Sequence, residues 1–303
     1  MADEFHVIDQ IVAALGEQSH APWVSLGPGD DAAVGQLSAG CEWVASVDTL
    51  VEGVHFPEHA PGELVGYRSL MVSLSDLAAM GASPVYVLVA LTLPDFSDTW
   101  VIDLARGMAR AGAEVGVPVV GGNLARGPLT IAVSVHGEVP AAGAVTRSGA
   151  QAGDGVYVTG ALGSAAACVR LEAFTVDGAL SPLQKAYYQP RARLDLSEGL
   201  RNCASAAVDI SDGLLADAAH LAQASGVDLD ICREDVPLGP QAAIADALGG
   251  GDDYEVLFTS AQAPQFGYRI GTVLAGSGLV RLDGTPANVR GYNHGNAGAH
   301  NAS

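Results

Sequence analysis

The stretch Gly27-Pro28-Gly29-Asp30-Asp31-Ala32-Ala33-Val34 (GPGDDAAV, 27–34) joins a sharp turn to two adjacent carboxylates and a small apolar segment. Glycine and proline favour the tight bend. An aspartate in such a turn commonly bonds to nearby backbone, which is the simplest explanation for either residue. Two neighbouring carboxylates also suit a cation. The rest of the sequence must decide between these explanations.

The composition is that of a globular protein with two domains. The chain has 303 residues, 49% of them hydrophobic, and 38 glycines, and a domain usually has about 150 residues. Its start, MADEFHVIDQ, is acidic where a secretory signal is basic, and the longest apolar run, residues 85–93, is too short to cross a bilayer. We therefore expect a cytoplasmic protein outside the membrane. The cysteines form no C-x-x-C pair, which predicts reduced thiols without a chemical role.

The charge balance limits the classes of partner. With 34 acidic and 14 basic residues the formal net charge is −20, which disfavours binding to nucleic acid or anionic lipid. Lys185 is the only lysine. Phosphate groups bound by this chain would therefore need divalent cations and a few arginines for countercharge. A solvated acidic surface is the alternative explanation of the same charge.

Hydrophobic periodicity predicts two successive α/β series. The first has helices near 5–15, 63–81 and 100–115, and strands at 43–47, 84–93, 117–122 and 129–139. Residues 84–93 are apolar enough for burial on both faces. The turn-rich segment 140–155 then predicts domains at 1–139 and 140–303. The second series has strands at 156–160, 206–210, 227–231 and 255–259, helices from about 161 and over 214–224, and a frayed tail at 295–303.

Aspartates recur where predicted elements begin or end. Asp48 and Asp209 follow buried strands, at the carboxyl ends where α/β folds place ligand sites. Ser211 is expected to cap a helix that starts near Asp212, and free N–H groups at a helix start can hold a phosphate. Hard oxygen ligands of this type suit Mg²⁺, which is held by one or two carboxylates plus substrate phosphates. Taken singly, each aspartate is better explained as a turn residue, a cap or a solvated side chain.

Asp76 makes it harder to explain all of these aspartates as turn residues, caps or solvated side chains. It lies among Leu74, Leu77 and Met80, which predicts a partly buried carboxylate that needs a partner. The sequence has neither a G-x-x-x-x-G-K-[ST] loop nor a G-x-G-x-x-G fingerprint. The glycine-rich sequences GGN (121–123) and GGGDD (249–253) are expected to be tight turns that bring bare backbone close to whatever the aspartates hold.

A series of motifs, taken in order, resembles the thiamine-monophosphate kinase family, of the superfamily that includes aminoimidazole ribonucleotide synthetase and selenophosphate synthetase. The motifs extend through nearly the whole chain: GPGDDAAV, VDTLVEGVHF, SLSDLAAMGASP, GGNLARG, TRSGA, VDISDGL, GGDDYEVLFT and RGYNH. The resemblance implies two α/β domains of the aminoimidazole ribonucleotide synthetase-like type and a homodimer formed through the N-terminal sheets. It also implies ATP-dependent, Mg²⁺-assisted phosphorylation of thiamine monophosphate to thiamine diphosphate.

The resemblance further implies roles for individual residues. The magnesium ligands would be Asp30, Ser46, Val47 through its backbone, Asp48, Asp76, Asn123, Asp209 and Asp212. The ATP contacts would be Gly121, Gly122, Asn123, Arg147 and Ser211, and the thiamine substrate would meet His55, Asp252 and Tyr292. Asp48, Asp76, Arg147 and Asp212 would carry the catalysis. In-line transfer to an already ionised phosphate depends on positioning and charge neutralisation and needs no strong general base.

Three positions depart from the family pattern. Asn123 stands where the family has a metal-binding aspartate, Asp252 where it has a substrate-contacting glutamate, and Asn293 where it has a late aspartate. Two alternatives stay open: another ATP-using member of the superfamily, and a weakly active or non-catalytic protein that binds nucleotide or thiamine phosphates. The sequences VEGVHF and GGDDYE favour the kinase over the first alternative. Turnover of ATP with thiamine monophosphate separates it from the second.

Overall fold

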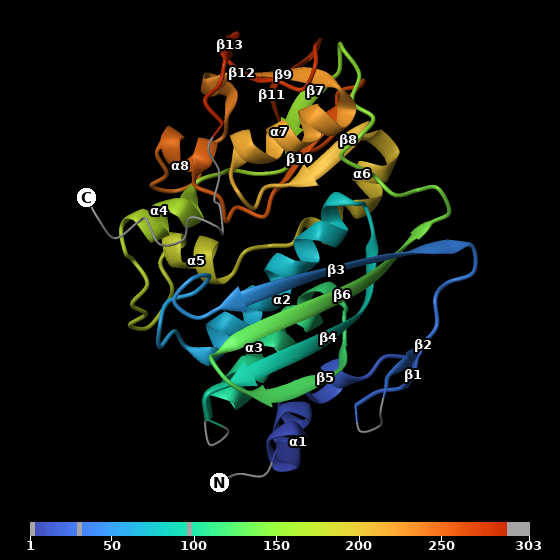
Figure 1. The fold of residues 1–303 in the computed structure, drawn as a ribbon, viewed down its shortest axis with the longest axis vertical. Coiled ribbons are helices and arrows are strands. Elements are labelled where there is room, and N and C mark those ends of the chain that lie inside the picture. Colours follow the sequence, from blue (N-terminus) through green and yellow to red (C-terminus); the bar gives the residue numbers. More distant parts are fainter. Residues whose placement is uncertain (1–3, 29–31, 96–98, 290–303) are drawn as a thin grey trace. The chain divides into compact units, whose positions relative to one another are not determined.

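The computed structural model describes residues 4–28, 32–95 and 99–289 (Figure 1). The chain divides into two compact units, of which the first comprises residues 1–77 and 82–143 and the second residues 78–81 and 144–303. Each unit has its own main sheet. Among the described helices, none has both the length and the apolar composition that a bilayer-spanning segment needs. Asp30, Tyr292, Asn293 and the tail 295–303 lie outside the described residues.

The first unit is built on a four-stranded mixed sheet in the order β3-β6-β4-β5. β6 lies antiparallel to both β3 and β4, whereas β4 and β5 are parallel and therefore need the crossover helix α3 between them. The strands are β3 (Cys41–Val51), β4 (Ser83–Leu93), β5 (Val119–Arg126) and β6 (Thr130–Pro140), and β1 (Val24–Leu26) pairs separately with β2 (Val34–Gly35).

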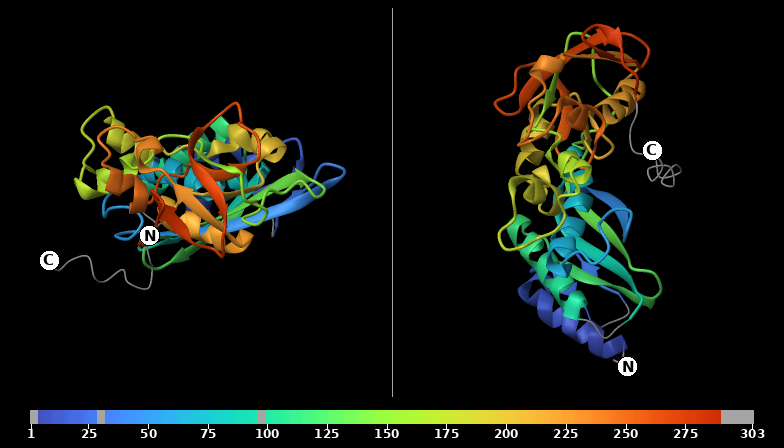
Figure 2. Two further views of the ribbon diagram at one scale, coloured as in Figure 1. Left: turned by 90° about the horizontal axis from the view of Figure 1, so that it is seen from above. Right: turned by 90° about the vertical axis from the view of Figure 1, so that its left-hand side faces the viewer.

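Helices cover one face of this sheet (Figures 1 and 2). They are α1 (Glu4–Leu15), α2 (Gly62–Ala79) and α3 (Thr99–Val115), with the short 3-10 helix η1 (Gly16–Ser19). Two glycines let α2 and α3 pack backbone against backbone. A Cβ on Gly66 would overlap the carbonyl oxygen of Leu104, and a Cβ on Gly107 would overlap that of Glu63. This close packing leaves α2, the helix that carries Asp76, little freedom to move.

The other face of the four-stranded sheet is open in the single chain. Along β4 the buried residues alternate with more exposed ones, so the expectation that residues 84–93 are buried on both faces is wrong. Both faces of the strand are apolar, but the helices cover only one of them. Trp43 and Val47 of β3 are 45% and 63% exposed on the open face. There the rings of Trp43, Tyr86 and His136 form a cluster with centroids 4.6 to 5.6 Å apart.

The second unit is built on a seven-stranded sheet in the order β13-β12-β9-β11-β7-β10-β8. Neighbouring strands are antiparallel except β9 and β12. Helix α7 (Leu214–Ser225) packs against β8 and β9 and shares their apolar core. The strands are β7 (Gly155–Val158), β8 (Ala206–Asp209), β9 (Val227–Ile231), β10 (Val256–Ser260), β11 (Tyr268–Ala275), β12 (Val280–Leu282) and β13 (Thr285–Pro286). The shorter helices are α4 (Ser164–Arg170), α5 (Pro182–Tyr188), η2 (Arg193–Leu196), α6 (Ser197–Cys203), η3 (Arg233–Asp235) and α8 (Ile244–Gly249).

The helices and strands expected from periodicity are present, but some of their ends and one turn differ. The sequence GGN (121–123), expected to form a tight turn, lies inside β5. The glycine has a packing role there, because a Cβ on Gly122 would overlap the carbonyl oxygen of Val89 on the parallel neighbour β4. In the sequence GGGDD (249–253), Gly249 ends α8 and residues 250–253 do form a loop.

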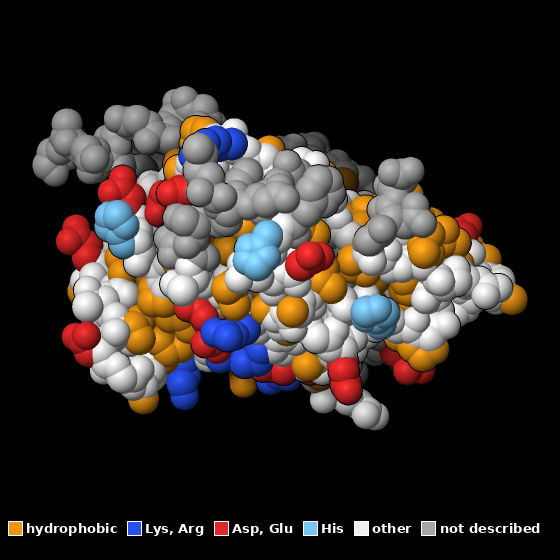
Figure 3. All heavy atoms as spheres, turned by 90° about the horizontal axis from the view of Figure 1, so that it is seen from below, with side chains coloured by type: hydrophobic (Ala, Val, Ile, Leu, Met, Phe, Trp, Pro, Cys, Tyr) orange, Lys and Arg blue, Asp and Glu red, His pale blue; other side chains and the backbone are white. Residues whose placement is uncertain are grey.

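Acidic and basic side chains are interspersed at the surface. On the face shown in Figure 3, Lys and Arg side chains of the described residues lie in small groups between acidic and apolar ones. The formal net charge of −20 is therefore accompanied, on this face, by scattered cations. Phosphate groups that approach this face meet single arginines and not a broad cationic surface.

Candidate active site

Three predicted magnesium ligands meet where β3 passes α2 in the first unit. Burial alternates along β3, and Ser46 and Asp48 lie on the same face as the buried Val44 and Leu50. Asp76 reaches this face from near the C-terminal end of α2. The Ser46 hydroxyl donates a hydrogen bond of 2.5 Å to Asp76 Oδ2. The two-residue period of the strand thus places a hydroxyl and a carboxylate beside the carboxylate of the helix.

The electrostatics of Asp48 favour the binding of a cation. Burial, followed by the nearby Asp76 carboxylate, raises the pKa of Asp48 from 3.8 to about 6, although a hydrogen bond with Ser73 opposes the shift. Within the described residues, none of the ion pairs involves Asp48 or Asp76. Two carboxylates this close resist joint ionisation unless a cation joins them. Two carboxylates and a hydroxyl fit Mg²⁺, which prefers oxygen ligands and completes its shell with water and phosphate.

The predicted substrate residue His55 lies in the loop that follows β3. The backbone N–H of Val51 donates to His55 Nδ1 at 3.0 Å, and the backbone N–H of His55 donates to the Val51 carbonyl at 2.9 Å. Because Nδ1 accepts a hydrogen bond, the neutral ring carries its proton on Nε2. The loop thus fixes the imidazole to the strand that carries Asp48 and makes Nε2 a donor suited to an anionic or carbonyl oxygen.

The predicted nucleotide residues 121–123 lie at the opposite edge of the same sheet. The strand order puts β5 three strand spacings, or about 14 Å, from β3. Asn123 is in register with Thr49, and Thr49 points away from the face that carries Asp48. Val47 also lies on that other, open face. A single chain therefore does not bring the Asn123 side chain to Asp48.

In the second unit, the antiparallel pairing of β8 and β10 brings the motifs VDISDGL and GGDDYEVLFT next to each other. Asp209 ends β8 directly opposite Val256, which begins β10. The segment after β8 and the segment before β10 therefore run side by side, and the backbone N–H of Asp252 donates to the Ser211 carbonyl at 2.9 Å. The structure thus brings together these predicted site residues: Asp209, Ser211, Asp212 and Asp252.

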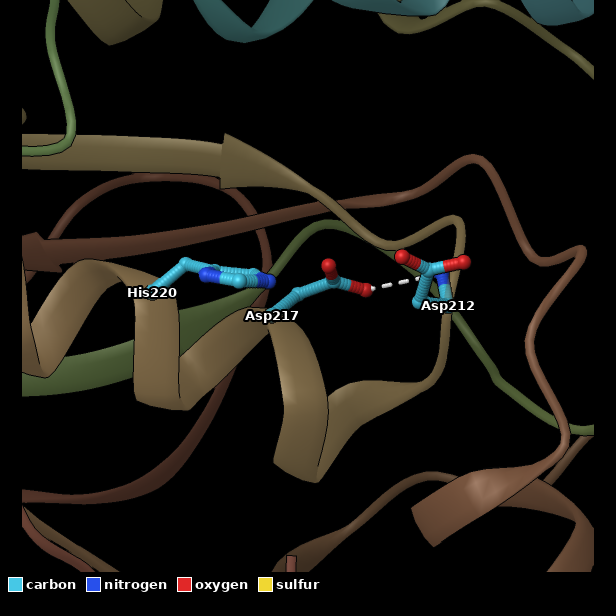
Figure 4. A group of neighbouring side chains, drawn as sticks. All are labelled: Asp212, Asp217 and His220. Carbon is cyan, nitrogen blue, oxygen red and sulfur yellow. Dashed lines mark hydrogen bonds between the residues drawn. The ribbon is translucent and has the colours of Figure 1, made fainter. Parts of the chain in front are cut away.

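The expected range 214–224 agrees with helix α7, but the expected helix start near Asp212 and the cap by Ser211 are wrong. The helix starts at Leu214 and has no side-chain cap, because Gly213, with a φ of 114°, turns the chain just before it. The backbone N–H groups of Ser211 and Asp212 both donate to Asp217 Oδ2, at 3.1 Å each. Asp217 reaches back from the first turn of α7 (Figure 4). A carboxylate of the chain itself therefore occupies the position expected for a phosphate.

Sequence reasoning missed Asp217 as a member of this site. Its side chain is 3% exposed, and burial, followed by the Asp212 carboxylate, raises the pKa of Asp217 to about 7. Asp212, Asp217 and His220 each offer one ligand atom, and these atoms lie within 4.8 Å of one another (Figure 4). The available signal was an aspartate inside the apolar sequence LLADAA. A buried carboxylate needs a partner there for the same reason as at Asp76.

Asp252 lies on a strained loop between α8 and β10. Gly251, Asp252 and Tyr254 have φ values of 71°, 65° and 53°, in the left-handed region that non-glycine residues seldom adopt. A Cβ on Gly251 would lie 2.5 Å from the Ser211 carbonyl oxygen, so the close approach requires glycine. The Tyr254 hydroxyl donates to Asp252 Oδ1 at 2.9 Å. The loop therefore presents the Asp252 carboxylate in a defined orientation.

Two other acidic residues of the GGDDYE motif hold the loop in place. Glu255 Oε2 pairs with Arg193 at 2.6 Å. Asp253 Oδ1 accepts the backbone N–H of Gly163 at 2.7 Å, and burial raises the pKa of Asp253 well above its usual range. The Asp253 contact ties the loop to the segment between β7 and α4, and the Glu255 contact ties it to η2.

Arg147 lies in the segment before β7. The Ser225 hydroxyl donates to the Arg147 carbonyl at 2.9 Å, and the neighbouring Thr146 carbonyl accepts the backbone N–H of Ala207 in β8 at 2.9 Å. The backbone of this segment is thus held beside β8, while the Arg147 side chain is exposed. An exposed guanidinium on a fixed backbone suits contact with a phosphate.

The N-terminal part of the sequence matches a described class of domain. The family model "AIR synthase related protein, N-terminal domain" matches residues 29–139. These residues include the strands β3, β4, β5 and nearly all of β6, together with Ser46, Asp48 and Asp76. The first unit therefore contains a domain of the AIR synthase-related class, and the predicted ligands Ser46, Asp48 and Asp76 lie within it.

Comparison over most of the chain narrows the class to one family. Thiamine-monophosphate kinase of Escherichia coli (strain K12) is 38% identical over 250 residues, which cover 78% of this chain and 76% of that protein. The crystal structure of thiamine-monophosphate kinase from Stenotrophomonas maltophilia K279a matches with a TM-score of 0.84 and 36% identity, covering 94% of this chain and 98% of that one. The structure of AaThiL complexed with AMPPCP and TMP matches with a TM-score of 0.79 and 32% identity, covering 96% of each chain. The chain belongs to the thiamine-monophosphate kinase family.

Proposed function

We propose that this protein transfers the γ-phosphoryl group of ATP to thiamine monophosphate and forms thiamine diphosphate. Its family supports this reaction, and the related AaThiL structure is a complex with AMPPCP and TMP. The observation that carries the proposal is the group of Ser46, Asp48 and Asp76, whose oxygens converge while no cation of the described residues pairs with either carboxylate. The whole chain has a single lysine. Because the reaction draws on the cytoplasmic ATP pool, we place it in the cytoplasm.

The proposed chemistry assigns metal binding to both units. Asp48 and Asp76, with Ser46, would hold Mg²⁺ in the first unit, and Asp209 and Asp212 would do so in the second. When bound, Mg²⁺ neutralises charge between the two repelling phosphate groups. The rigid packing of α2 and the β8–β10 pairing keep these carboxylates in place, so little reorganisation accompanies the transfer. The acceptor phosphate is already ionised near neutral pH, and no residue has to remove a proton from it.

We assign the thiamine substrate to His55, Asp252 and Tyr292. The thiazolium ring of thiamine carries a positive charge, which a carboxylate complements. The Tyr254 hydroxyl aims the Asp252 carboxylate, and the hydrogen bond at Nδ1 leaves the Nε2–H of His55 as the donor.

We also propose that the working form is a homodimer joined through the open face of the four-stranded sheet. That face carries the aromatic cluster and the exposed side chains of Trp43 and Val47, which mark an interaction surface. Asn123 lies on the same open face, in register with Thr49, so a second copy would place it at the interface, on the other side of the sheet from Asp48.

Light scattering tests the dimer. The wild type should have the mass of two chains, and Val47→Asp should have the mass of one. Val169→Asp is the matched control, because Val169 is 46% exposed in the second unit and should leave the mass unchanged. A monomeric wild type would contradict the proposal.

The proposed reaction is tested by chromatography of mixtures containing the protein, ATP, Mg²⁺ and thiamine monophosphate. ADP and thiamine diphosphate should form in equal amounts, EDTA should abolish both, and unphosphorylated thiamine should give no diphosphate. Binding of both substrates without product would favour the non-catalytic alternative, for which the neutral side chain of Asn123 is the relevant observation.

A further inference from the structure

Asp217 holds the loop that carries Ser211 and Asp212. It lies on α7 with 3% of its surface exposed, and its Oδ2 accepts the backbone N–H groups of Ser211 and Asp212 at 3.1 Å each (Figure 4). One buried oxygen thus orients two consecutive peptide groups. The Asp212 carboxylate projects from the second of these two residues.

The same loop is held from its other side by the loop that carries Asp252. The Ser211 carbonyl accepts the backbone N–H of Asp252 at 2.9 Å, so the N–H of Ser211 bonds to Asp217 and its C=O bonds to the backbone of Asp252. A Cβ on Gly213 would lie 2.9 Å from the Gly249 carbonyl carbon. The chain therefore has little room to take another path between β8 and α7.

We propose that Asp217 is a positioning residue for the phosphoryl transfer. By accepting both N–H groups it sets the direction of the Asp212 carboxylate, and through the Ser211 peptide it ties that direction to the placement of Asp252. The inference rests on the proposed kinase function, in which Asp212 is a metal ligand and Asp252 a substrate contact. The proposal predicts that a substitution at Asp217 changes the kinetics with both ATP and thiamine monophosphate.

The role requires an acceptor oxygen and no negative charge, which makes it separable from metal binding. Asp217→Asn keeps an amide oxygen that can accept both N–H groups, whereas Asp217→Leu has a similar size and no acceptor. A metal ligand would depend on the charge, and Asn would then fail as Leu does. The pair of variants therefore distinguishes the two roles.

Asp228 supplies matched controls in the same unit. It is also 3% exposed, and its Oδ1 accepts the backbone N–H groups of Ser277 and Leu279 at 2.9 and 3.0 Å. Asp228→Leu removes the same kind of double contact from the segment of Ser277 and Leu279, outside the loop at residues 209–213. Asp228→Asn is the milder version. Any effect of lost folding alone should appear in the Asp228 variants as well.

The first readout is amide hydrogen exchange of Ser211 and Asp212, measured by NMR on the full-length protein with EDTA and without nucleotide. Their exchange should accelerate in Asp217→Leu and stay near the wild-type rate in Asp217→Asn and Asp228→Asn. Unchanged exchange in Asp217→Leu would overturn the proposal. This measurement does not depend on turnover, so it decides the positioning role even if the wild type proves inactive and the proposed function fails.

The second readout is steady-state kinetics. Asp217→Leu should lower kcat/KM for Mg·ATP by roughly 10- to 100-fold and raise the KM for thiamine monophosphate, while Asp217→Asn restores both toward wild type. The Asp228 variants should lose thermal stability and keep the wild-type dependence on Mg²⁺. If Asp217→Asn is as impaired as Asp217→Leu, or if Asp217→Leu turns over normally, the proposal is wrong.

Discussion

Asp217 and Asp228 occupy similar settings in the second unit but have opposite electrostatics. Each is 3% exposed, and one oxygen of each accepts two backbone N–H groups. Backbone hydrogen bonds, together with the Arg281 guanidinium at 3.0 Å, lower the pKa of Asp228 to about 2. Burial and the Asp212 carboxylate raise the pKa of Asp217 to about 7. Since both aspartates have the backbone bonds and desolvation raises the pKa of both, the neighbouring charge distinguishes them: Arg281 lowers the pKa of Asp228, and the Asp212 carboxylate raises that of Asp217.

This difference separates an aspartate that is paired with a protein cation from aspartates that are buried beside a second carboxylate. Asp228 has its own cation in Arg281. Asp48 resembles Asp217, because its pKa is raised to about 6 by burial and a second carboxylate. A carboxylate buried without a protein cation must take up a proton or bind a cation from solution. We therefore expect substitution of Asp48 to lower turnover and substitution of Asp228 to lower stability.

The largest effect is expected on turnover. Asp48→Asn should lower the rate of thiamine diphosphate formation roughly 100-fold or more, because it removes a charged metal ligand. Asp228→Asn, measured under the same conditions, should keep the wild-type rate. The initial rate at limiting Mg²⁺ is the measurement, and a near-normal rate for Asp48→Asn there would remove Asp48 from the proposed ligands.

The second effect concerns stability and belongs to Asp228. Its pKa is depressed in the folded state, so its stabilisation is present above the unfolded-state pKa of 3.8 and is lost as the pH falls through about 2. Asp228→Asn should lower the urea midpoint at pH 7, and the gap to wild type should narrow below pH 4. An equal gap at both values would mean that the ion pair does not account for the stabilisation.

The third effect is a gain of stability at Asp48 in EDTA. A raised pKa contributes stability below the unfolded-state value of 3.8, which is lost as the pH rises through about 6. The full difference corresponds to about 3 kcal/mol, and water reduces it because Asp48 is only partly buried. At pH 8 the free energy of unfolding of Asp48→Asn should therefore be about 1 to 2 kcal/mol higher than that of the wild type. At pH 4 the two should be equal. A loss of stability at pH 8 would show that the carboxylate supports the metal-free fold.

The smallest effect is expected at Asn123, on the open face of the first unit. Asn123→Asp adds a charged oxygen ligand and should tighten the apparent Mg²⁺ affinity with ATP by roughly two- to fivefold. The Mg²⁺ dependence of the initial rate measures this change. An unchanged or weaker dependence would indicate that Asn123 is not part of a metal site.

Most of the fold could be predicted from local patterns. The alternation in residues 129–139 and the apolar run 84–93 predicted the two central strands, β6 and β4. The polar, turn-rich composition of residues 140–155 predicted a connecting segment after them. Burial was harder to predict, because β4 is apolar on both sides and periodicity does not say which layer covers each side. The GGN sequence was wrongly predicted to form a turn for a similar reason. Its glycine is needed because β4 packs closely against it, and no local pattern shows that contact.

The candidate site was only partly predictable. Asp48 was expected just after a strand that ends at 47, which is wrong because β3 continues to Val51, whereas Asp76 was selected as a carboxylate in an apolar helix. The structure brings both of them together with Ser46. Asp217 was missed because its partners are backbone N–H groups, which every residue has and no motif marks. The separation of Asn123 from Asp48 was equally hidden, because it depends on a strand order that the sequence does not state.

Thermal unfolding with Mg²⁺ and AMPPCP tests the central claim most directly, namely that Asp48 and Asp76 bind the metal that holds the nucleotide. Ligand at 100 times its dissociation constant stabilises by about 2.7 kcal/mol, which corresponds to a rise in Tm of roughly 5 °C or more. We predict this rise for the wild type and Asp228→Asn with Mg²⁺ and AMPPCP together, a small rise with Mg²⁺ alone, and almost none for Asp48→Asn or for AMPPCP with EDTA. Equal stabilisation by AMPPCP in the presence of EDTA would contradict the account.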